Sequence, residues 1–261
     1  GAAKARAREF FPAAETFESS AELLALDEVE IVDIATHPAG RGDLMRAALE
    51  AGKNVLSQKP FVLTLADGRE LADFAQRQGV KLAVNQNGRW APHLAMIREA
   101  VKADLIGVLE EVDISVAWDH SWTVGTAFDR TAHLVLFDFG VHWFDFIVSL
   151  LGEREITQVE ASVSFSPGQS SPQPMIAKVE IRGDGFKASI AFDGDSSDRQ
   201  SDVTRVAGST GSLQSEGPDL RDQALSLILG DERIELPLTG DWFSTGFEGS
   251  MCELIASVRS G

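Results

Sequence analysis

The sequence contains few of the residues on which disulfide bridges and thiolate metal sites depend. Cys252 is the single cysteine among the 261 residues. One thiol cannot form a disulfide within the chain, and it excludes a metal site built from several cysteines. The composition fits a reducing compartment, and we expect a cytoplasmic protein without a bound metal ion.

Positive charge and long apolar runs are also scarce. The chain has 23 Lys and Arg against 40 Asp and Glu, which gives a formal net charge of -17, and it has no dense basic cluster. A nucleic-acid backbone or an anionic membrane would therefore repel it. No apolar run reaches the ~18 residues that a membrane-spanning helix needs. We expect small-molecule partners, with no nucleic acid and no membrane among them.

The first third of the chain alternates short apolar runs with helical patterns. The apolar runs lie at residues 30–35, 54–57 and 80–84. Thr64 and Gly79 have the positions of an N-cap and a C-cap around one intervening helix. Strands that alternate with helices of about 10 to 15 residues predict βαβ units and a parallel sheet. Ligands bind beyond the carboxyl ends of such strands, where the polar segments are Thr36-His37-Pro38, Gln58-Lys59-Pro60 and residues 85–89.

From residue 108 onward the pattern changes to that of half-buried strands. Apolar and more polar residues alternate in residues 112–118, 159–165, 177–181 and 186–192. This alternation is typical of antiparallel strands with one face on a core. We expect an α/β protein with a partial Rossmann-like parallel sheet at residues 1–88. An α+β domain with a large, mostly antiparallel open sheet would follow at residues 89–261.

Residues 134–152, LVLFDFGVHWFDFIVSLLG, are strongly apolar but carry three polar groups at helical spacing. In one α-helix, Asp138, His142 and Asp145 would share a face, because they stand at i, i+4 and i+7. Burying an unpaired charge is costly, so these groups must face either solvent or a polar cleft. The segment alone leaves both alternatives open.

Short motifs follow one another along the chain in a recognisable order. They are IATHP, AALEAGKNVLSQKP, AVNQNGRWAP, LIGVLEEV, DFGVHWFD, VAGSTGSL and WFSTGFEGSMCEL. This order resembles that of the Gfo/Idh/MocA family of nicotinamide-dependent sugar and polyol oxidoreductases. The most specific part is the Lys-Pro step at Lys59 with the Asp-x-x-x-His at Asp138. The resemblance covers nearly the whole chain and implies a Rossmann domain followed by a domain with a large open sheet.

The resemblance assigns catalytic roles to three residues. When a hydride leaves a carbinol carbon for a nicotinamide ring, the hydroxyl proton needs a base, which would be His142. Asp138 would hold one tautomer of that imidazole and stabilise the imidazolium. Lys59 would donate a hydrogen bond to the substrate oxygen. The implied cofactor is NAD or NADP, and the implied substrate is a secondary alcohol of a sugar, inositol or related polyol.

Other polar residues are expected around this centre. The cofactor contacts would come from Thr36, His37, Pro38, Gln58, Lys59 and Asn87. The substrate contacts would come from Lys59, Arg89, Asp138 and His142. For Asn87 and Arg89 a structural role at the strand end is an equally open alternative.

Two further features are expected to be structural. Asp145 would be structural or lie at the edge of the pocket. Gly208 and Gly211, in the segment GSTGS, favour a hairpin turn over a phosphate site, because they fall between two strands.

Two departures from the family pattern affect the expectation. Gln58 stands where the family has a glutamate before Lys-Pro, which removes a charged partner of Lys59. No G-x-G-x-x-G turn is present to receive a pyrophosphate. We therefore expect a fragment that lacks this N-terminal segment and the end of its last domain. Such a chain would bind NAD(H) or NADP(H) weakly or not at all, which a titration of cofactor fluorescence tests.

Two further expectations concern the whole protein. The family resemblance suggests a homodimer or homotetramer built on the open sheet. The alternative to an enzyme is a non-catalytic sensor or regulator that binds nucleotide and ligand on the same fold. The presence together of Lys59, Asp138 and His142 argues for the enzyme.

Overall fold

The computed structural model describes residues 2–261, which divide into two compact units. The first unit takes the chain up to Val84 together with Leu254–Gly261, and the second is Asn85–Glu253. Each unit has a hydrophobic core of its own.

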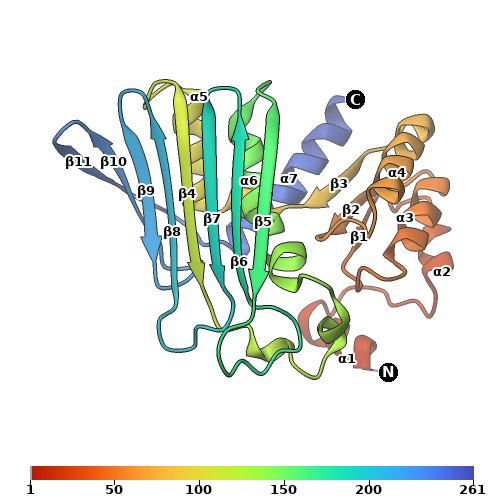
Figure 1. The fold of residues 1–261 in the computed structure, drawn as a ribbon. Helices are drawn as coiled ribbons and strands as arrows, with labels where there is room; N and C mark the ends of the chain where they lie inside the picture. Colours follow the sequence, from red (N-terminus) through yellow and green to blue (C-terminus); the bar gives the residue numbers. More distant parts are fainter. Residues whose placement is uncertain (1) are drawn as a thin grey trace. The chain divides into compact units, whose positions relative to one another are not determined.

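The first unit is built from a parallel sheet and the helices between its strands. Its elements are α1 (Ala2–Phe10), α2 (Ser20–Leu24), β1 (Ile31–Ile34), α3 (Arg41–Glu50), β2 (Asn54–Gln58), α4 (Leu65–Gln78) and β3 (Leu82–Asn85) (Figure 1). The strand order is β1-β2-β3, and β1 pairs in parallel with β2. Helix α4 begins and ends as predicted. The Thr64 side chain accepts a hydrogen bond from the Asp67 N–H, and Gly79 ends the helix with a φ of 69°.

The second unit is built on one large sheet. Its elements are a 3-10 turn η1 (Asn87–Trp90), α5 (Pro92–Lys102), β4 (Leu109–Ala117), turns η2 (Ser121–Thr123) and η3 (Ala127–Arg130), a π-helical turn η4 (Val135–Phe139), α6 (Val141–Leu151), β5 (Ile156–Ser164), β6 (Ile176–Gly183), β7 (Phe186–Asp193), β8 (Ser201–Gly208), β9 (Ser212–Gly217), β10 (Ala224–Leu229), β11 (Glu232–Leu236) and most of α7 (Ser244–Ser260). The predicted mostly antiparallel sheet is confirmed. Its order is β11-β10-β9-β8-β4-β7-β6-β5, and the pair β4 and β7 is parallel.

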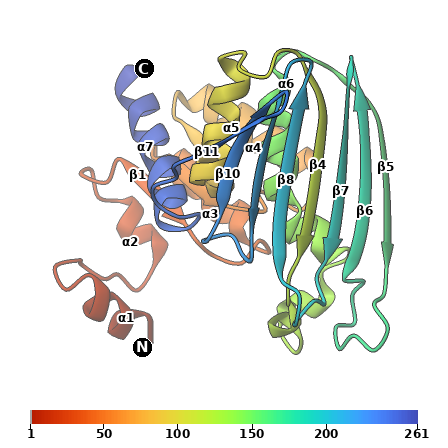
Figure 2. The ribbon, with the colours of Figure 1, turned by 90° about the vertical axis from the view of Figure 1, so that its left-hand side faces the viewer.

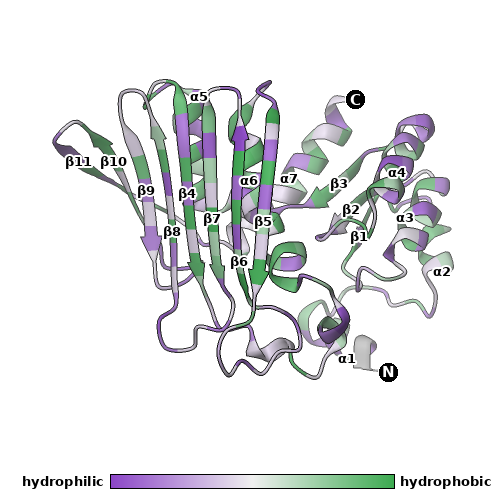
Figure 3. Cartoon of the chain, viewed as in Figure 1, coloured by the Kyte–Doolittle hydropathy of each residue, from purple (hydrophilic) through white to green (hydrophobic). Residues whose placement is uncertain are grey.

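Helices α5 and α6 lie along one face of this sheet (Figures 1 and 2). The strands beneath them alternate in burial, with Val112, Ile114 and Val116 of β4 buried and the residues between them at least partly exposed. Figure 3 shows the same alternation of hydrophobic and hydrophilic residues along the central strands. The face under the helices is called the inner face below, and the opposite face the outer face.

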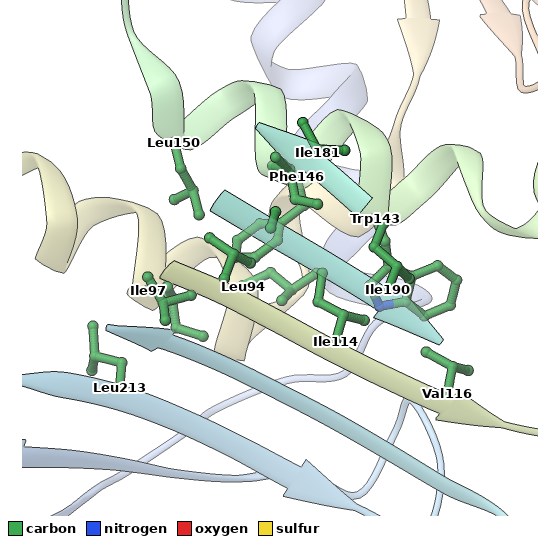
Figure 4. Packing of buried hydrophobic residues seen from close by; sticks show 14 of the residues in the cluster. Leu94, Ile97, Ile114, Val116, Trp143, Phe146, Leu150, Ile181, Ile190 and Leu213 are labelled. Atoms are coloured by element: carbon green, nitrogen blue, oxygen red, sulfur yellow. The ribbon is translucent and has the colours of Figure 1, made fainter. Parts of the chain in front are cut away.

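The core of the second unit lies between the two helices and the inner face. Figure 4 shows Leu94 and Ile97 of α5 and Trp143 and Phe146 of α6 directed toward side chains of β4, β6, β7 and β9. Phe146 has no exposed surface. Among residues 2–261, no helix is both long and apolar enough to cross a bilayer.

Candidate active site

The apolar segment at residues 134–152 is not a single α-helix, which corrects the prediction. A π-helical turn occupies Val135–Phe139, and α6 begins at Val141. The Gly140 N–H donates to the Val135 carbonyl over five residues, at 2.7 Å. Gly140 is required here, because a Cβ would lie 2.9 Å from the Leu136 carbonyl oxygen and 3.1 Å from the Phe144 ring. π-Helical turns of this kind are frequent at functional sites.

Asp138 and His142 lie on either side of this change of helix type. Asp138 belongs to the π-helical turn and is buried, whereas His142 stands in the first turn of α6 and is half-buried. The His142 ring packs edge-to-face against Trp242, with ring centroids 5.5 Å apart and an interplanar angle of 87°. The histidine is therefore held by an aromatic contact to a residue one hundred positions away in the chain.

Asp145 is held by an ion pair with Arg89. The Arg89 guanidinium donates from Nε and Nη2 to the two carboxylate oxygens of Asp145, at 2.9 Å and 2.6 Å. This bidentate bond raises the pKa of Arg89. The turn that carries Asn87 and Arg89 thus packs beside α6, and a Cβ on Gly88 would lie 3.4 Å from the His142 Cβ. Sequence analysis did not foresee this pair, since nothing local links residues 56 positions apart.

The remaining predicted residues lie in the first unit, at the carboxyl ends of β1 and β2. Thr36 and His37 are exposed, Pro38 is half-buried, and Lys59 follows β2 with a cis peptide bond to Pro60. These two loops border a hollow of about 260 Å³ that Pro38, Gly40 and Phe61 help to line.

Arg41 ties these two loops together, and sequence analysis missed it. Its side chain is only 3% exposed. Its guanidinium donates to the Thr36 carbonyl from Nε at 3.0 Å and to the Pro60 carbonyl at 2.7 Å, and it also donates to the Gln58 carbonyl. The carbonyls on both sides of Lys59 are therefore anchored by one buried side chain. No pattern in the neighbouring sequence indicated that Arg41 is buried.

One expectation outside this centre can be compared with the structure. The GSTGS segment is the predicted hairpin, since the Gly208 N–H donates to the Gly211 carbonyl at 2.9 Å between β8 and β9. Among the described residues, 2–261, no group of three or more His, Cys, Asp or Glu side chains could hold a metal ion.

Comparison with known proteins supplies the family. Residues 1–86 match the model of an oxidoreductase family with an NAD-binding Rossmann fold, and residues 94–214 match that of the GFO/IDH/MocA C-terminal domain. The chain belongs to the Gfo/Idh/MocA oxidoreductase family.

Several relatives of this Gfo/Idh/MocA chain are named dehydrogenases. The D-apiose dehydrogenase of Paraburkholderia graminis is 31% identical over 57% of this chain and 39% of its own length. The D-xylose 1-dehydrogenase (NADP(+)) of Hypocrea jecorina is 26% identical over 87% of this chain and 64% of its own length. The chain thus spans less than two thirds of either relative.

Solved structures agree with the Gfo/Idh/MocA fold. An inositol dehydrogenase homolog from Azotobacter vinelandii, complexed with NADH and myo-inositol, superposes with a TM-score of 0.69 at 19% identity, over 87% of this chain and 69% of that chain. An oxidoreductase from Agrobacterium radiobacter, in complex with NAD+, L-tartaric acid and magnesium, gives a TM-score of 0.81 at 15% identity, over 98% and 77% of the two chains.

Proposed function

We propose that the protein is an NAD(P)-dependent oxidoreductase that transfers a hydride between a nicotinamide and a secondary alcohol of a sugar, inositol or related polyol. The observation that carries the proposal is the placement of Asp138 in the π-helical turn and of His142 in the first turn of α6, in a chain of this family. The names of the apiose and xylose dehydrogenases support the substrate class. Domain roles follow, with cofactor binding in residues 1–88 and substrate binding and oligomerisation in residues 89–261.

The residues of the first unit fit the nicotinamide end of such a cofactor. Exposed Thr36 and His37 lie in the loop after β1, and Lys59 follows the end of β2, so polar side chains stand at the carboxyl ends of two parallel strands. Ligands of parallel sheets bind at this edge. Thr36, His37, Pro38, Gln58, Lys59 and Asn87 would hold NAD or NADP, which supplies the hydride acceptor when bound.

The chain's own residues would handle the proton. As the carbinol C–H bond breaks and its electron pair leaves as a hydride, the hydroxyl proton passes to the His142 imidazole and the carbonyl forms. Asp138 would fix the imidazole tautomer and stabilise the positive charge. Lys59 would donate a hydrogen bond to the same oxygen and stabilise its developing negative charge. Arg89, paired with Asp145, would contact the other hydroxyl groups of the substrate.

We also propose that two or four copies associate through the outer face of the large sheet. A hollow of about 360 Å³ lies on this face, lined in part by Ser115, Ala117, Lys178 and Ala191. Small side chains let a second sheet approach closely, and Lys178 offers charge to a partner carboxylate. Ala191→Arg should convert the oligomer to monomer in sedimentation velocity; an unchanged sedimentation coefficient would exclude this face.

A screen of polyols and aldoses with NAD and with NADP tests the function. We expect the absorbance of reduced nicotinamide to appear with at least one of them and to be lost in His142→Ala. If the wild-type protein binds cofactor but turns over no compound in the screen, it is a ligand-binding sensor instead. Turnover that survives in His142→Ala would exclude the assigned base.

A further inference from the structure

The segment that follows β11 contacts both the turn η1 and His142. The contacts come from Trp242, which precedes α7, and from the first half of α7. Trp242 is 1% exposed, and its indole ring lies edge-to-face with His142 at 5.5 Å. The same indole is flanked by Trp143 at 5.7 Å and by His93 at 5.9 Å. Four rings from three parts of the chain therefore share one buried site.

Glycines allow this close approach. A Cβ on Gly88 would lie 2.6 Å from Cζ2 and 2.9 Å from Cη2 of Trp242. A Cβ on Gly246 would lie 2.6 Å from the Asn87 carbonyl oxygen, and one on Gly249 would lie 2.6 Å from the Trp90 ring. Each distance is far below van der Waals contact, so the turn and the start of α7 fit together only because these side chains are absent.

The packing restricts the indole. Buried interiors are close-packed, so a ring that is enclosed on several sides has little room to change its orientation. Edge-to-face pairs favour one mutual geometry, in which the positive edge of one ring meets the negative face of the other. The His142 imidazole is half-buried, and one of its contacts is the edge-to-face packing against Trp242. Contact with the enclosed indole restricts rotation of the imidazole about its Cβ–Cγ bond.

We propose that Trp242 is a positioning residue for His142. It holds the imidazole at the angle at which one ring nitrogen meets the substrate hydroxyl. Gly88 is required for this positioning, because any side chain at residue 88 would displace the Trp242 indole. The effect of this positioning on catalysis rests on the proposed function, but the orientation of the His142 ring can be measured without substrate or cofactor.

The first test observes the histidine directly. In ¹H–¹³C spectra of the protein without cofactor, the His142 ring signals should carry the ring-current shift of the neighbouring indole. They should move in Trp242→Leu and in Gly88→Ala, and return part-way in Trp242→Phe, which keeps an aromatic ring. Gly42→Ala is the matched glycine control, since nothing lies within 4 Å of its added Cβ. His142 signals that stay in place in a folded Trp242→Leu protein would overturn the proposal.

The second test separates positioning from loss of stability. Because small misplacements of reacting groups cost rate rather than affinity, Trp242→Leu should lower kcat by ~10–100-fold while KM changes less than about twofold. Leu150→Ala removes core volume from the same helix α6, farther along it, and should leave kcat unchanged. Equal losses of kcat in the two variants would reduce Trp242 to a core residue and refute the proposal. The spectra remain decisive if the wild-type protein turns over no polyol.

Discussion

Asp202 gives a prediction that follows directly from the packing of the large sheet. It stands on β8 opposite Val116 of β4, on the inner face, and is 0% exposed. Neither of its carboxylate oxygens has a hydrogen-bond partner within the described residues, 2–261. Desolvation therefore raises the pKa of Asp202 from 3.8 to about 7. The carboxyl group stays protonated in the folded protein over a range in which the unfolded chain is ionised.

The sign and size of the effect follow by linkage. Below pH 4 both states are protonated and Asp202 contributes no pH dependence. Between pH 4 and 7 the unfolded state alone ionises, so the free energy of unfolding falls by about 1.4 kcal/mol per pH unit. Above pH 7 the loss levels off at about 4 kcal/mol, for a shift from 3.8 to about 7. Asp202→Asn removes this dependence, so its stability advantage over wild type should grow by about 3 kcal/mol between pH 5 and pH 8.

Urea unfolding followed by tryptophan fluorescence measures this difference. All five tryptophans lie between residues 90 and 242, in the unit that contains Asp202. Asp198→Asn is the matched control, because the Asp198 side chain is 80% exposed. Equal stabilities of wild type and Asp202→Asn across pH 5 to 8 would refute the reasoning.

Three further predictions concern stability. Burial lowers the pKa of His93 to about 3, so below pH 6.5 the unfolded state alone takes up a proton. The free energy of unfolding should therefore be lower by about 2 kcal/mol at pH 5 than at neutral pH. His93→Gln should abolish this pH dependence, as measured by urea titrations. Arg41→Met leaves three carbonyls without their hydrogen-bond donor and should lower the free energy of unfolding by ~3 kcal/mol. We expect faster amide hydrogen exchange in β1 and β2, and unchanged exchange would argue against the anchoring role of Arg41. Phe146→Ala should lower the free energy of unfolding by about 3–5 kcal/mol, as measured from the shift in the urea midpoint. A decrease of less than ~1 kcal/mol would contradict the place of Phe146 in the core.

Local patterns in the sequence predicted much of the fold because they depend on neighbouring residues alone. The cap at Thr64, the glycine end of α4 and the hairpin at Gly208–Gly211 are each set within a few residues. The alternation of residues 112–118 likewise predicted which face of β4 is buried. These features need no knowledge of distant parts of the chain.

The π-helical turn was not predicted, although its contacts are local. Gly140 closely approaches Leu136 and Phe144 there, and an argument from helical spacing treats these residues as part of an ordinary α-helix. Alternation on β5 predicted a core face, and Val159 does lie opposite Ile181 of β6, but the strand is at the sheet edge and Val159 stays 58% exposed.

The candidate site also combines residues that the sequence indicated with contacts that it did not. Motif spacing pointed to Lys59, Asp138 and His142, whose roles stay predictions. It could not indicate that Arg89 pairs with Asp145, because side chains 56 residues apart leave no common pattern. The buried anchor at Arg41 is hidden for another reason, since arginine at the start of a helix is ordinarily solvated.

Isotope transfer is the most direct test of the account. With a polyol deuterated at the carbinol carbon that reacts in the screen, the protein should place deuterium on the nicotinamide ring, with a primary isotope effect on the chemical step. His142→Ala should lose this transfer, whereas cofactor and substrate should still bind. Deuterium that appears in solvent instead of on the nicotinamide, or transfer at the wild-type rate in His142→Ala, would contradict hydride transfer with His142 as the base.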